Sequence, residues 1–404
     1  MTKRIAAMAV IAALTLIPTS GAGATAHGNA NGNGNGGTPP GFTLAVFGDS
    51  PYGTTPTDTS EFDATPAFID SINADPAVRG VIHVGDIHSG KQYCTEAYDR
   101  SIYDQWTRFA DPLVYTPGDN EWADCHKPAE GGGTYNASTG QIDYVLDPST
   151  QQPVDYAKGD PLANLDLVRS IFFSQPGRTL GGGHLEVTSQ AQAYDHAHPT
   201  DAHYVENVMW EQHDVLFVTI NVPGGSNNDA DPWYKTPTAS AAQQQEMNDR
   251  TSADDRWLDA AFASATRDHT VGLVIITQAD MWDLDGKTSD HLTNYEPIIS
   301  NVATHTSQFG KPVLMFNGDS HVYRSDNPLS ASAPCTTEVS SGEGACASDY
   351  PNHPGYDVPN FHRVVVHGST FPLEWLKLAI NEDWNAPASA NAFGPFTWQR
   401  MTQN

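Results

Sequence analysis

Four segments of the chain combine a short apolar run with a Gly-Asp pair near its end. They are residues 42–49 (FTLAVFGD), 79–86 (RGVIHVGD), 112–120 (PLVYTPGDN) and 311–319 (KPVLMFNGD). Carboxylates that converge at one place repel each other unless a cation lies between them. Oxygen ligands with an occasional imidazole suit divalent ions such as Mn, Fe, Zn, Mg or Ca. The pattern therefore predicts a site for divalent metal ions.

The candidate ligands lie at or just after the ends of these runs. They are Asp49, Asp86, Asp119 or Asn120, Asp319 and His321. A single Gly-Asp pair is usually a turn or a helix cap. Four such pairs, one followed two residues later by a histidine, favour a metal site instead. Two ions that share one carboxylate would polarise a phosphoryl group and generate hydroxide from bound water.

The elements around these residues predict how they are brought together. The apolar runs have the β-branched composition of strands that are buried on both faces. Residues 61–73 and 96–109 have apolar residues at helical spacing, and Pro66 is expected in the first turn of the earlier helix. Alternating strands and helices predict a parallel sheet with right-handed crossovers. Ligands bind at the carboxyl edge of such a sheet, where the Gly-Asp pairs would lie.

The second half of the chain is predicted to continue this α/β pattern. We expect helices at 162–173, 238–267 and 297–309, and strands at 204–210, 215–222, 271–277, 361–368 and 373–380. Residues 126–161 and 325–358 lack a regular pattern and are predicted to be insertions.

The first 41 residues are expected to lie outside the folded domain. Residues 1–26 have the basic start, apolar core and small-residue end of a secretory signal peptide. Residues 27–41 form a linker rich in Gly and Asn, and residues 42–404 are predicted to form a single domain. We therefore expect a secreted protein without a membrane anchor.

The charge and the cysteines fit that compartment. A formal net charge of −28 repels nucleic acids and anionic membranes, so no nucleic-acid-binding surface is expected. An even number of cysteines in a secreted chain predicts disulfides, and local pairing gives Cys94–Cys125 and Cys335–Cys346. The alternative, a four-cysteine zinc site, lacks the usual CxxC spacing.

The order of the motifs resembles the calcineurin-like metallophosphoesterases over about residues 42–380. The matching motifs are Asp49, Gly85-Asp86, Gly118-Asp119-Asn120-Glu121 and Gly318-Asp319-Ser320-His321. The resemblance implies a four-layer α/β/β/α sandwich with mixed sheets and two divalent metal ions at the strand ends. It also implies that metal-bound hydroxide hydrolyses a small phosphomonoester or phosphodiester, with Asp86 bridging the two ions.

The chain departs from that family's pattern at several positions. Pro51 stands where the first motif has a histidine, and Tyr52 is an alternative ligand there. Gln278 stands in place of a lone histidine and is predicted to bind metal through its amide oxygen. Asp319 replaces the first histidine of the last motif, which resembles the PhoD-like alkaline phosphatases.

The family's catalytic histidine is also replaced, because Asn120 occupies its place. We predict catalytic roles for Asn120 and for His88, the nearest imidazole that could act as a general acid. Lys91 and His126 are predicted to contact the substrate, and His126 is a second candidate for the acid.

Two other functions remain open from the sequence. Three replaced imidazole positions also fit a degenerate member that binds a metal or ligand without turnover. Less favoured is a GDSL-type serine esterase with Ser50 as nucleophile, because its triad needs a late Asp-x-x-His pair. The late pair here, Asp319-Ser320-His321, is one residue too short.

Overall fold

The structure is a computed structural model that describes residues 42–228, 232–284, 289–340 and 342–402. The predicted signal peptide and linker lie outside the described residues. Residues Pro40–Asn404 form one compact unit. None of the helices in the described ranges has both the length and the apolar character needed to cross a membrane.

The first sheet has seven strands in the order β17-β18-β16-β1-β2-β3-β6. Its strands are β1 (Phe42–Phe47), β2 (Val78–His83), β3 (Pro112–Tyr115), β6 (Leu180–Gly181), β16 (Glu374–Ile380), β17 (Ala392–Phe393) and β18 (Phe396–Thr402). The central strands β1, β2 and β3 are parallel, as predicted. β16 lies antiparallel between β1 and β18. β18 was not predicted from the sequence.

The second sheet has nine strands in the order β14-β13-β12-β15-β11-β10-β9-β8-β7. Its strands are β7 (Thr188–Ser189), β8 (Val208–Gln212), β9 (Val215–Thr219), β10 (Gly272–Ile276), β11 (Val313–Asn317), β12 (Arg324–Asp326), β13 (Thr336–Val339), β14 (Gly342–Ala345) and β15 (Phe361–Val365). The core strands β9, β10, β11 and β15 are parallel. A separate hairpin, β4 (Gly133–Asn136) and β5 (Gln141–Tyr144), lies in the first insertion.

Two groups of helices accompany the sheets. The helices are α1 (Ser60–Asn73), α2 (Glu96–Trp106), α3 (Pro161–Phe172), α4 (Gln190–Ala193), α5 (Gly224–Asn228), α6 (Ala241–Arg267) and α7 (Glu296–Phe309). Short 3₁₀ turns are η1 (Pro128–Glu130), η2 (Pro199–His203), η3 (Trp233–Lys235), η4 (Ser289–Tyr295) and η5 (Tyr350–Asn352).

Local sequence signals explain where several helices begin. Thr95, Asp160 and Ser240 each accept a backbone N–H at the start of α2, α3 and α6. The prediction for Pro66 was wrong, because α1 begins at Ser60 and Pro66 lies inside it. α5 is a left-handed turn, since the φ angles within it are near +60°.

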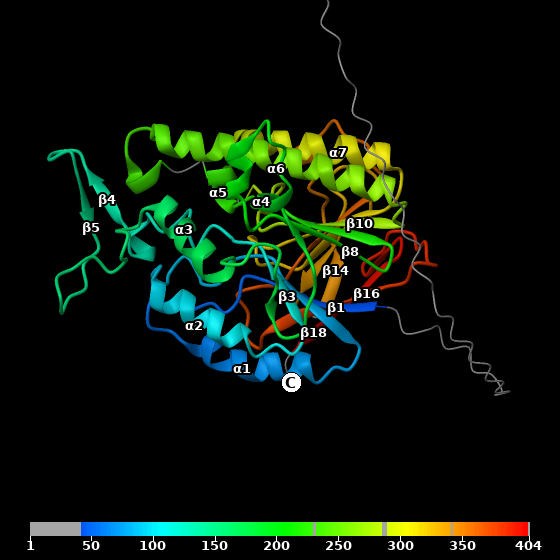
Figure 1. Cartoon of the computed structure of the whole chain (residues 1–404), viewed down its shortest axis with the longest axis horizontal. Coiled ribbons are helices and arrows are strands. Elements are labelled where there is room, and N and C mark those ends of the chain that lie inside the picture. Colours follow the sequence, from blue (N-terminus) through cyan, green and yellow to red (C-terminus); the bar gives the residue numbers. More distant parts are fainter. Residues whose placement is uncertain (1–41, 229–231, 285–288, 341, 403–404) are drawn as a thin grey trace, which may run out of the picture. The chain divides into compact units, whose positions relative to one another are not determined.

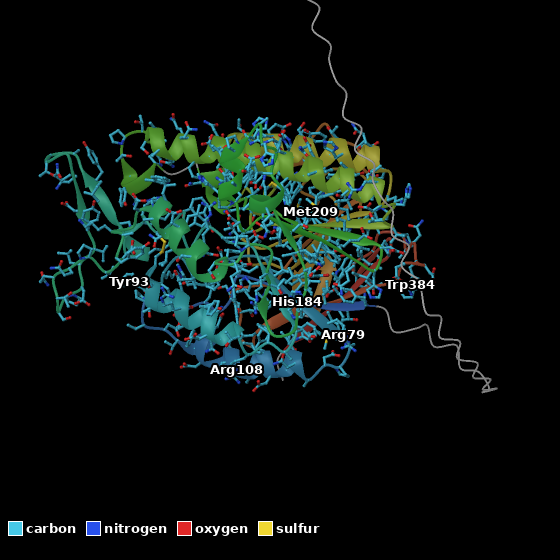
Figure 2. The ribbon with its side chains drawn as sticks, in the orientation of Figure 1. Arg79, Tyr93, Arg108, His184, Met209 and Trp384 are labelled. Carbon is cyan, nitrogen blue, oxygen red and sulfur yellow. A yellow bond between two sulfur atoms is a disulfide. The ribbon has the colours of Figure 1, made fainter. Side chains whose placement is uncertain are left out.

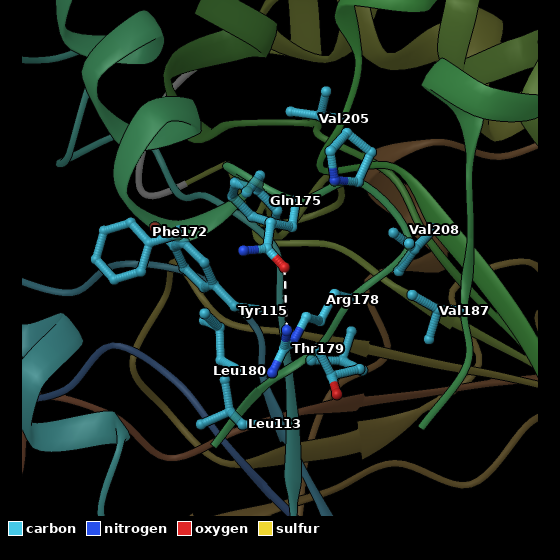
Figure 3. A pocket seen from close by; sticks show the side chains of 14 residues that line it. Leu113, Tyr115, Phe172, Gln175, Arg178, Thr179, Leu180, Val187, Val205 and Val208 are labelled. Carbon is cyan, nitrogen blue, oxygen red and sulfur yellow. Dashed lines mark hydrogen bonds between the residues drawn. The ribbon is translucent and has the colours of Figure 1, made fainter. Parts of the chain in front are cut away.

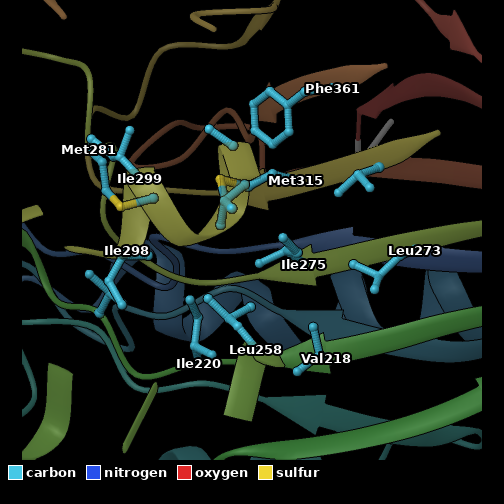
Figure 4. Close-up of a cluster of buried hydrophobic side chains, with 14 of the residues drawn as sticks. Val218, Ile220, Leu258, Leu273, Ile275, Met281, Ile298, Ile299, Met315 and Phe361 are labelled. Atoms are coloured by element: carbon cyan, nitrogen blue, oxygen red, sulfur yellow. The ribbon is translucent and has the colours of Figure 1, made fainter. Parts of the chain in front are cut away.

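Three apolar cores separate four layers of structure. The first core packs Phe68 of α1 and Trp106 of α2 against the outer face of the first sheet. The second fills the space between the sheets, where Val46 of β1 belongs to the same cluster as Phe217 of β9. The third lies between the second sheet and helices α6 and α7, and includes Leu258 (Figure 4). The order helix–sheet–sheet–helix is visible in Figure 1 and confirms the predicted fold class.

Charged side chains are distributed over the outside of this sandwich. Arg79, Arg108 and His184 are exposed and extend from the surface (Figure 2). Both predicted disulfides, Cys94–Cys125 and Cys335–Cys346, are present.

Candidate metal centre

The predicted ligands have an unusual backbone conformation. Asp49, Asp86, Asp319 and His321 have φ angles of 47°, 61°, 74° and 64°. Left-handed conformations cost non-glycine residues roughly 1–2 kcal/mol each and cluster at functional sites. These residues follow the carboxyl ends of β1, β2 and β11, so the strained loop ends meet at one edge of the two sheets.

Three of these residues form a compact group of metal-binding atoms. One ligand atom each from Asp49, Asp86 and His321 lies within 4.8 Å of the other two. His321 Nε2 is 3.7 Å from Asp49 Oδ1. Both aspartates are buried, whereas the side chain of His321 is 39% exposed. The group is therefore accessible from solvent on the histidine side.

Burial makes the negative charge of the carboxylates unfavourable. Burial raises the pKa of Asp49, and the nearby His321 opposes this rise. The pKa of Asp86 is raised well above its usual value by burial and then by the charges of Asp119, Glu121 and Asp49. A cation between these carboxylates would remove both costs.

Glycines bring the backbone against the carboxylates. A Cβ on Gly318 would lie 2.3 Å from Asp49 Oδ2, and one on Gly368 would lie 2.2 Å from Asp49 Cβ. A Cβ on Gly118 would lie 1.9 Å from Asp86 Oδ1. Real Cβ atoms do not come this close, so only glycine fits these three positions. This packing explains Gly118 and Gly318 in their Gly-Asp pairs.

A second pair of carboxylates lies beside the first group. A Cβ on Gly224 would lie 2.5 Å from Asp119 Oδ2 and 2.7 Å from Asp319 Oδ1. The two carboxylates therefore converge on the same side of Gly224. Asp319 Oδ2 accepts the backbone N–H of Asp280 at 3.1 Å. Burial and the Asp119 charge raise the pKa of Asp319 well above its usual value.

Asp86 Oδ2 accepts hydrogen bonds from three side chains. Tyr52 Oη donates at 2.6 Å, Asn120 Nδ2 at 3.1 Å and Gln278 Nε2 at 3.2 Å. Asn120 Nδ2 also lies 2.9 Å from Tyr52 Oη. These donors connect the ends of β1, β2, β3 and β10 through a single carboxylate oxygen.

Gln278 has a different orientation from the one predicted for a metal ligand. Its Oε1 accepts the Gly224 N–H at 2.6 Å, and its Nε2 donates to Asp119 Oδ1 at 2.9 Å. Because the Gly224 donor fixes which end of the amide is oxygen, the nitrogen faces the carboxylates. In this arrangement Gln278 links Asp86 to Asp119, and metal binding through its oxygen would require the amide to turn over.

Hydrogen bonds to Glu121 and a disulfide stabilise the loop that carries Asp119 and Asn120. Glu121 accepts the Gly118 N–H at 2.6 Å and a hydrogen bond from Tyr115. Burial raises the pKa of Glu121 to about 7. Cys94 Sγ lies 3.2 Å from the Asn120 carbonyl oxygen, so the Cys94–Cys125 disulfide packs directly against the loop.

The remaining predicted residues are His88, His126 and Lys91. His88 is fully buried, its Nδ1 lies 3.2 Å from the Ser89 carbonyl oxygen, and burial lowers its pKa to about 4. His126 is also buried and accepts the Tyr234 N–H at 3.0 Å. Lys91 is exposed on the surface. The structure thus brings together the aspartates, Asn120, Gln278 and His321.

Two residues that support the centre were not found from the sequence. Arg363 on β15 is fully buried, and forms ion pairs with Asp280 and with Asp326. Asp280 in turn receives a hydrogen bond of 2.9 Å from Ser320 Oγ and positions Asp319 through its N–H. The sequence does contain a signal for Arg363, because it stands within the apolar sequence of a strand. An arginine at such a position is rarely buried without a carboxylate partner.

His83 is the second such residue. Its Nε2 lies 3.0 Å from the Ser50 carbonyl oxygen, while its Nδ1 accepts the Gly85 N–H at 3.2 Å. Because Nδ1 is the acceptor, Nε2 carries the proton. The neutral imidazole therefore ties the loop after β1 to the loop after β2.

The arrangement fits a divalent metal ion. Asp49 Oδ2 is buried without a hydrogen-bond partner, which is costly for a carboxylate oxygen unless a cation occupies the space beside it. Carboxylates with one imidazole form a donor set for hard or borderline divalent ions.

An apolar pocket elsewhere is too small for a substrate. It lies between β3 and the segment 172–180, and its lining includes Leu113, Phe172 and Val208 (Figure 3). Its volume of about 20 Å³ is close to that needed by one water molecule.

The chain was compared with protein families, curated proteins and solved structures. No protein-family model matches the chain, and no curated protein does. A solved structure of a purple acid phosphatase from yellow lupin (Lupinus luteus) seeds matches with a TM-score of 0.37 and 12% identity. The match covers 89% of this chain and 51% of that one, so the chain spans about half the length of the phosphatase.

Proposed function

We propose that the chain is a secreted, metal-dependent phosphoesterase that hydrolyses a small phosphomonoester or phosphodiester. The observation that carries this proposal is the convergence of Asp49, Asp86 and His321 at strained loop ends, with Asp49 Oδ2 buried and unpaired. If these aspartates only capped turns, their carboxylates would be exposed to solvent and not buried without a hydrogen-bond partner. The exposed side of His321 provides access for a phosphate ester.

Two divalent ions, from among Mn, Fe, Zn and Ca, fit the donor atoms. Asp49, Asp86 and His321 would hold the first, and Asp119 and Asp319, with Asp86 shared, would hold the second. Such ions supply Lewis-acid activation of the phosphoryl group and of a water molecule.

The side chains around the ions orient and neutralise the reacting groups. Asn120 has its amide at the carboxylates, where it would donate a hydrogen bond to a phosphoryl oxygen. Tyr52 keeps its proton, because burial and the neighbouring Asp86 raise its pKa well above the usual value. His88 remains the proposed source of the leaving-group proton. Because burial lowers its pKa to about 4, the surrounding loop must open before its imidazole can take up a proton and deliver it. Lys91 and His126 remain proposals for substrate contacts.

Elemental analysis and hydrolysis assays test the proposal together. Purified protein would be analysed for bound metal, stripped with EDTA, and reloaded separately with Mn, Zn, Fe or Ca. We expect stoichiometric metal and metal-restored hydrolysis of p-nitrophenyl phosphate or bis-p-nitrophenyl phosphate. Bound metal without hydrolysis of any ester would refute the enzyme, whereas activity that EDTA does not affect would refute the metal centre.

A second candidate is a protein that binds a metal or ligand without turnover. The burial of His88 and His126 favours it, because neither imidazole is exposed to protonate a leaving group. The same two measurements separate it from the enzyme. The serine-esterase alternative predicts instead that Ser50→Ala abolishes ester hydrolysis that needs no metal.

A further inference from the structure

Packing fixes the stem of Gln278 beside the carboxylates of the candidate metal centre. Gln278 is fully buried. A Cβ on Gly85 would lie 2.6 Å from Gln278 Cβ and 2.7 Å from its Cγ, so the backbone of Gly85 packs directly against the stem. The Gln278 carbonyl oxygen accepts the Gly318 N–H at 3.0 Å. The part of the side chain that can still turn is the terminal amide, because the torsion that orients it has broad and roughly two-fold energy minima.

The amide nitrogen of Gln278 lies between two of the residues that would hold the second ion. Gln278 Nε2 donates to Asp119 Oδ1 at 2.9 Å and to Asp86 Oδ2 at 3.2 Å. An amide N–H₂ group has two protons to donate, so it can satisfy both carboxylates at once. The amide therefore provides part of the stabilisation that a cation would provide for these two buried groups.

Asp86 Oδ2 accepts more hydrogen bonds than one carboxylate oxygen has lone pairs. Besides the bond from Gln278, it accepts bonds from Tyr52 Oη at 2.6 Å and from Asn120 Nδ2 at 3.1 Å. An ionised carboxylate has about four lone-pair sites on its two oxygens. Asp49 Oδ2, in contrast, is buried and accepts no hydrogen bond. The centre therefore has one side with an unsatisfied carboxylate oxygen and one side where donors already satisfy the carboxylates.

Gly224 opposes any turn of the amide away from the carboxylates. Gln278 Oε1 accepts the Gly224 N–H at 2.6 Å. A half-turn of the amide would place its N–H₂ group against this N–H, so the Gly224 donor would lose its acceptor. Gly224 is buried, and the lost bond would not be replaced by bulk water. Binding of an ion between Asp86 and Asp119 must therefore supply the free energy for breaking these hydrogen bonds.

We propose that the Gln278 amide competes with the second metal ion for Asp86 and Asp119, so that the second ion binds more weakly than the first and exchanges. The proposal rests on the phosphoesterase function proposed above and names how the same site is regulated. Asp49 and His321 lie outside this competition and keep the first ion when the concentration of free divalent ions falls. The activity therefore follows the ion concentration over a range in which the first ion stays bound.

The first test is a calorimetric titration of EDTA-treated and dialysed wild-type protein with Mn²⁺. We expect two steps whose Kd values differ by at least about tenfold, because the second step breaks hydrogen bonds to charged groups. The Mn²⁺ concentration that gives half-maximal hydrolysis should match the Kd of the second step. A single step in which two ions bind with equal affinity would overturn the proposal.

Gln278→Met distinguishes a competing amide from a metal ligand. Methionine is unbranched and fills the buried space, but it has neither the N–H donor nor the amide oxygen. Its soft thioether is a poor ligand for Mn²⁺. If the amide competes with the ion, its removal should tighten the second step about two- to tenfold, the effect of one hydrogen bond. If Gln278 held the ion through Oε1, the same change would weaken the second step, and a weakened or unchanged step would overturn the proposal.

Gln278→Glu is the second variant, in case the methionine variant does not fold. A glutamate oxygen can still accept the Gly224 N–H, whereas the donor to the aspartates is lost. We expect the Kd of the second step to approach that of the first, and an unchanged or weaker second step would contradict the proposal. The matched control is Gln192→Met, at an exposed glutamine whose amide donates to the Pro176 carbonyl oxygen, which should leave both Kd values unchanged.

The calorimetric readout does not depend on turnover, so it separates the competing amide from the proposed function. Unequal steps that become more equal in Gln278→Met, without hydrolysis of any ester, would support the competition and refute the enzyme. Metal-dependent hydrolysis by a wild type that binds both ions with equal affinity would refute the competition alone. Failure of the wild type and of Gln278→Glu to bind any Mn²⁺ would refute the competition together with the metal centre.

Discussion

Replacing Asp49 by asparagine tests whether the centre is built for a cation. Asp49 Oδ1 accepts the Asp319 N–H at 2.9 Å, and an asparagine oxygen can keep that bond. The amide nitrogen would take the place of Oδ2, which is buried and unpaired. Asp49→Asn therefore removes a buried charge without changing the size of the side chain. We expect the metal-free variant to be more stable than the metal-free wild type.

The expected gain follows from the cost of an unsatisfied buried group. That cost is about 1–3 kcal/mol, and more for a charged group. A domain of about 360 residues unfolds with an entropy of roughly 0.8 kcal/mol/K, so the Tm should rise by about 1–4 °C. The wild type, in contrast, should gain about 2.7 kcal/mol from metal at 100 times its Kd, a rise of about 3–4 °C.

Thermal unfolding of EDTA-treated protein at pH 8, with and without added Mn²⁺, measures both effects. We expect Asp49→Asn to have the higher Tm without metal and little response to the ion. Asp70→Asn is the matched control, because Asp70 forms only an exposed ion pair with Arg108, and its Tm should change little. A lower Tm for metal-free Asp49→Asn than for metal-free wild type would refute the reasoning.

Four further predictions follow from the same contacts. His321→Ala should reduce the metal content to background and the activity by at least about a hundredfold, while the circular dichroism spectrum stays unchanged. A normal metal content in elemental analysis would contradict this prediction. Gly118→Ala should prevent metal binding in a titration, because its Cβ would lie 1.9 Å from a carboxylate oxygen of the centre. Burial lowers the pKa of His83 to about 4, so its contribution to stability is present above pH 6.5 and is lost as the pH falls toward 4. The advantage of the wild type over His83→Gln in denaturant unfolding should thus shrink by about 3 kcal/mol between pH 7 and pH 4, and a constant difference would argue against a neutral imidazole. Replacing Cys94 and Cys125 together by serine should cost about 2–4 kcal/mol of unfolding free energy and weaken metal binding, whereas unchanged affinity would show that the disulfide does not hold the Asn120 loop.

The sequence predicted the parts of the fold that follow from local pattern. The buried strands and the long helices could be read from apolar runs and helical spacing, whereas the four-layer order was expected only from the resemblance to the calcineurin-like metallophosphoesterases. The strand β18 was missed because buried and less buried residues alternate along Phe396–Thr402, which gives only a weak apolar pattern. Its pairing with β16, which defines it as a strand, is visible only in the structure. The start of the first helix was predicted to within one residue, but Pro66 was assigned to its first turn and lies instead in the interior of α1 (Ser60–Asn73).

The sequence predicted best those residues of the centre whose positions follow from the ends of strands. The structure joins Asp49, Asp86 and His321 because each follows a strand end at the same edge. The orientation of Gln278 could not be predicted, since it depends on an N–H from Gly224, which is 54 residues away. The burial of His88 also depends on distant packing, including the ring of Tyr98 at 5.6 Å.

The pairing of β1 with β16 has a consequence for how the chain folds. Phe42, at the start of the described residues, pairs with Ile380, and β16 in turn requires β18. The first sheet therefore cannot be completed until almost the whole chain has been synthesised. Contacts over such long sequence separations slow folding and leave apolar strands exposed meanwhile. Truncation after β16 would leave that strand as an open edge, and we expect the C-terminal strand to be needed for recovery of folded protein.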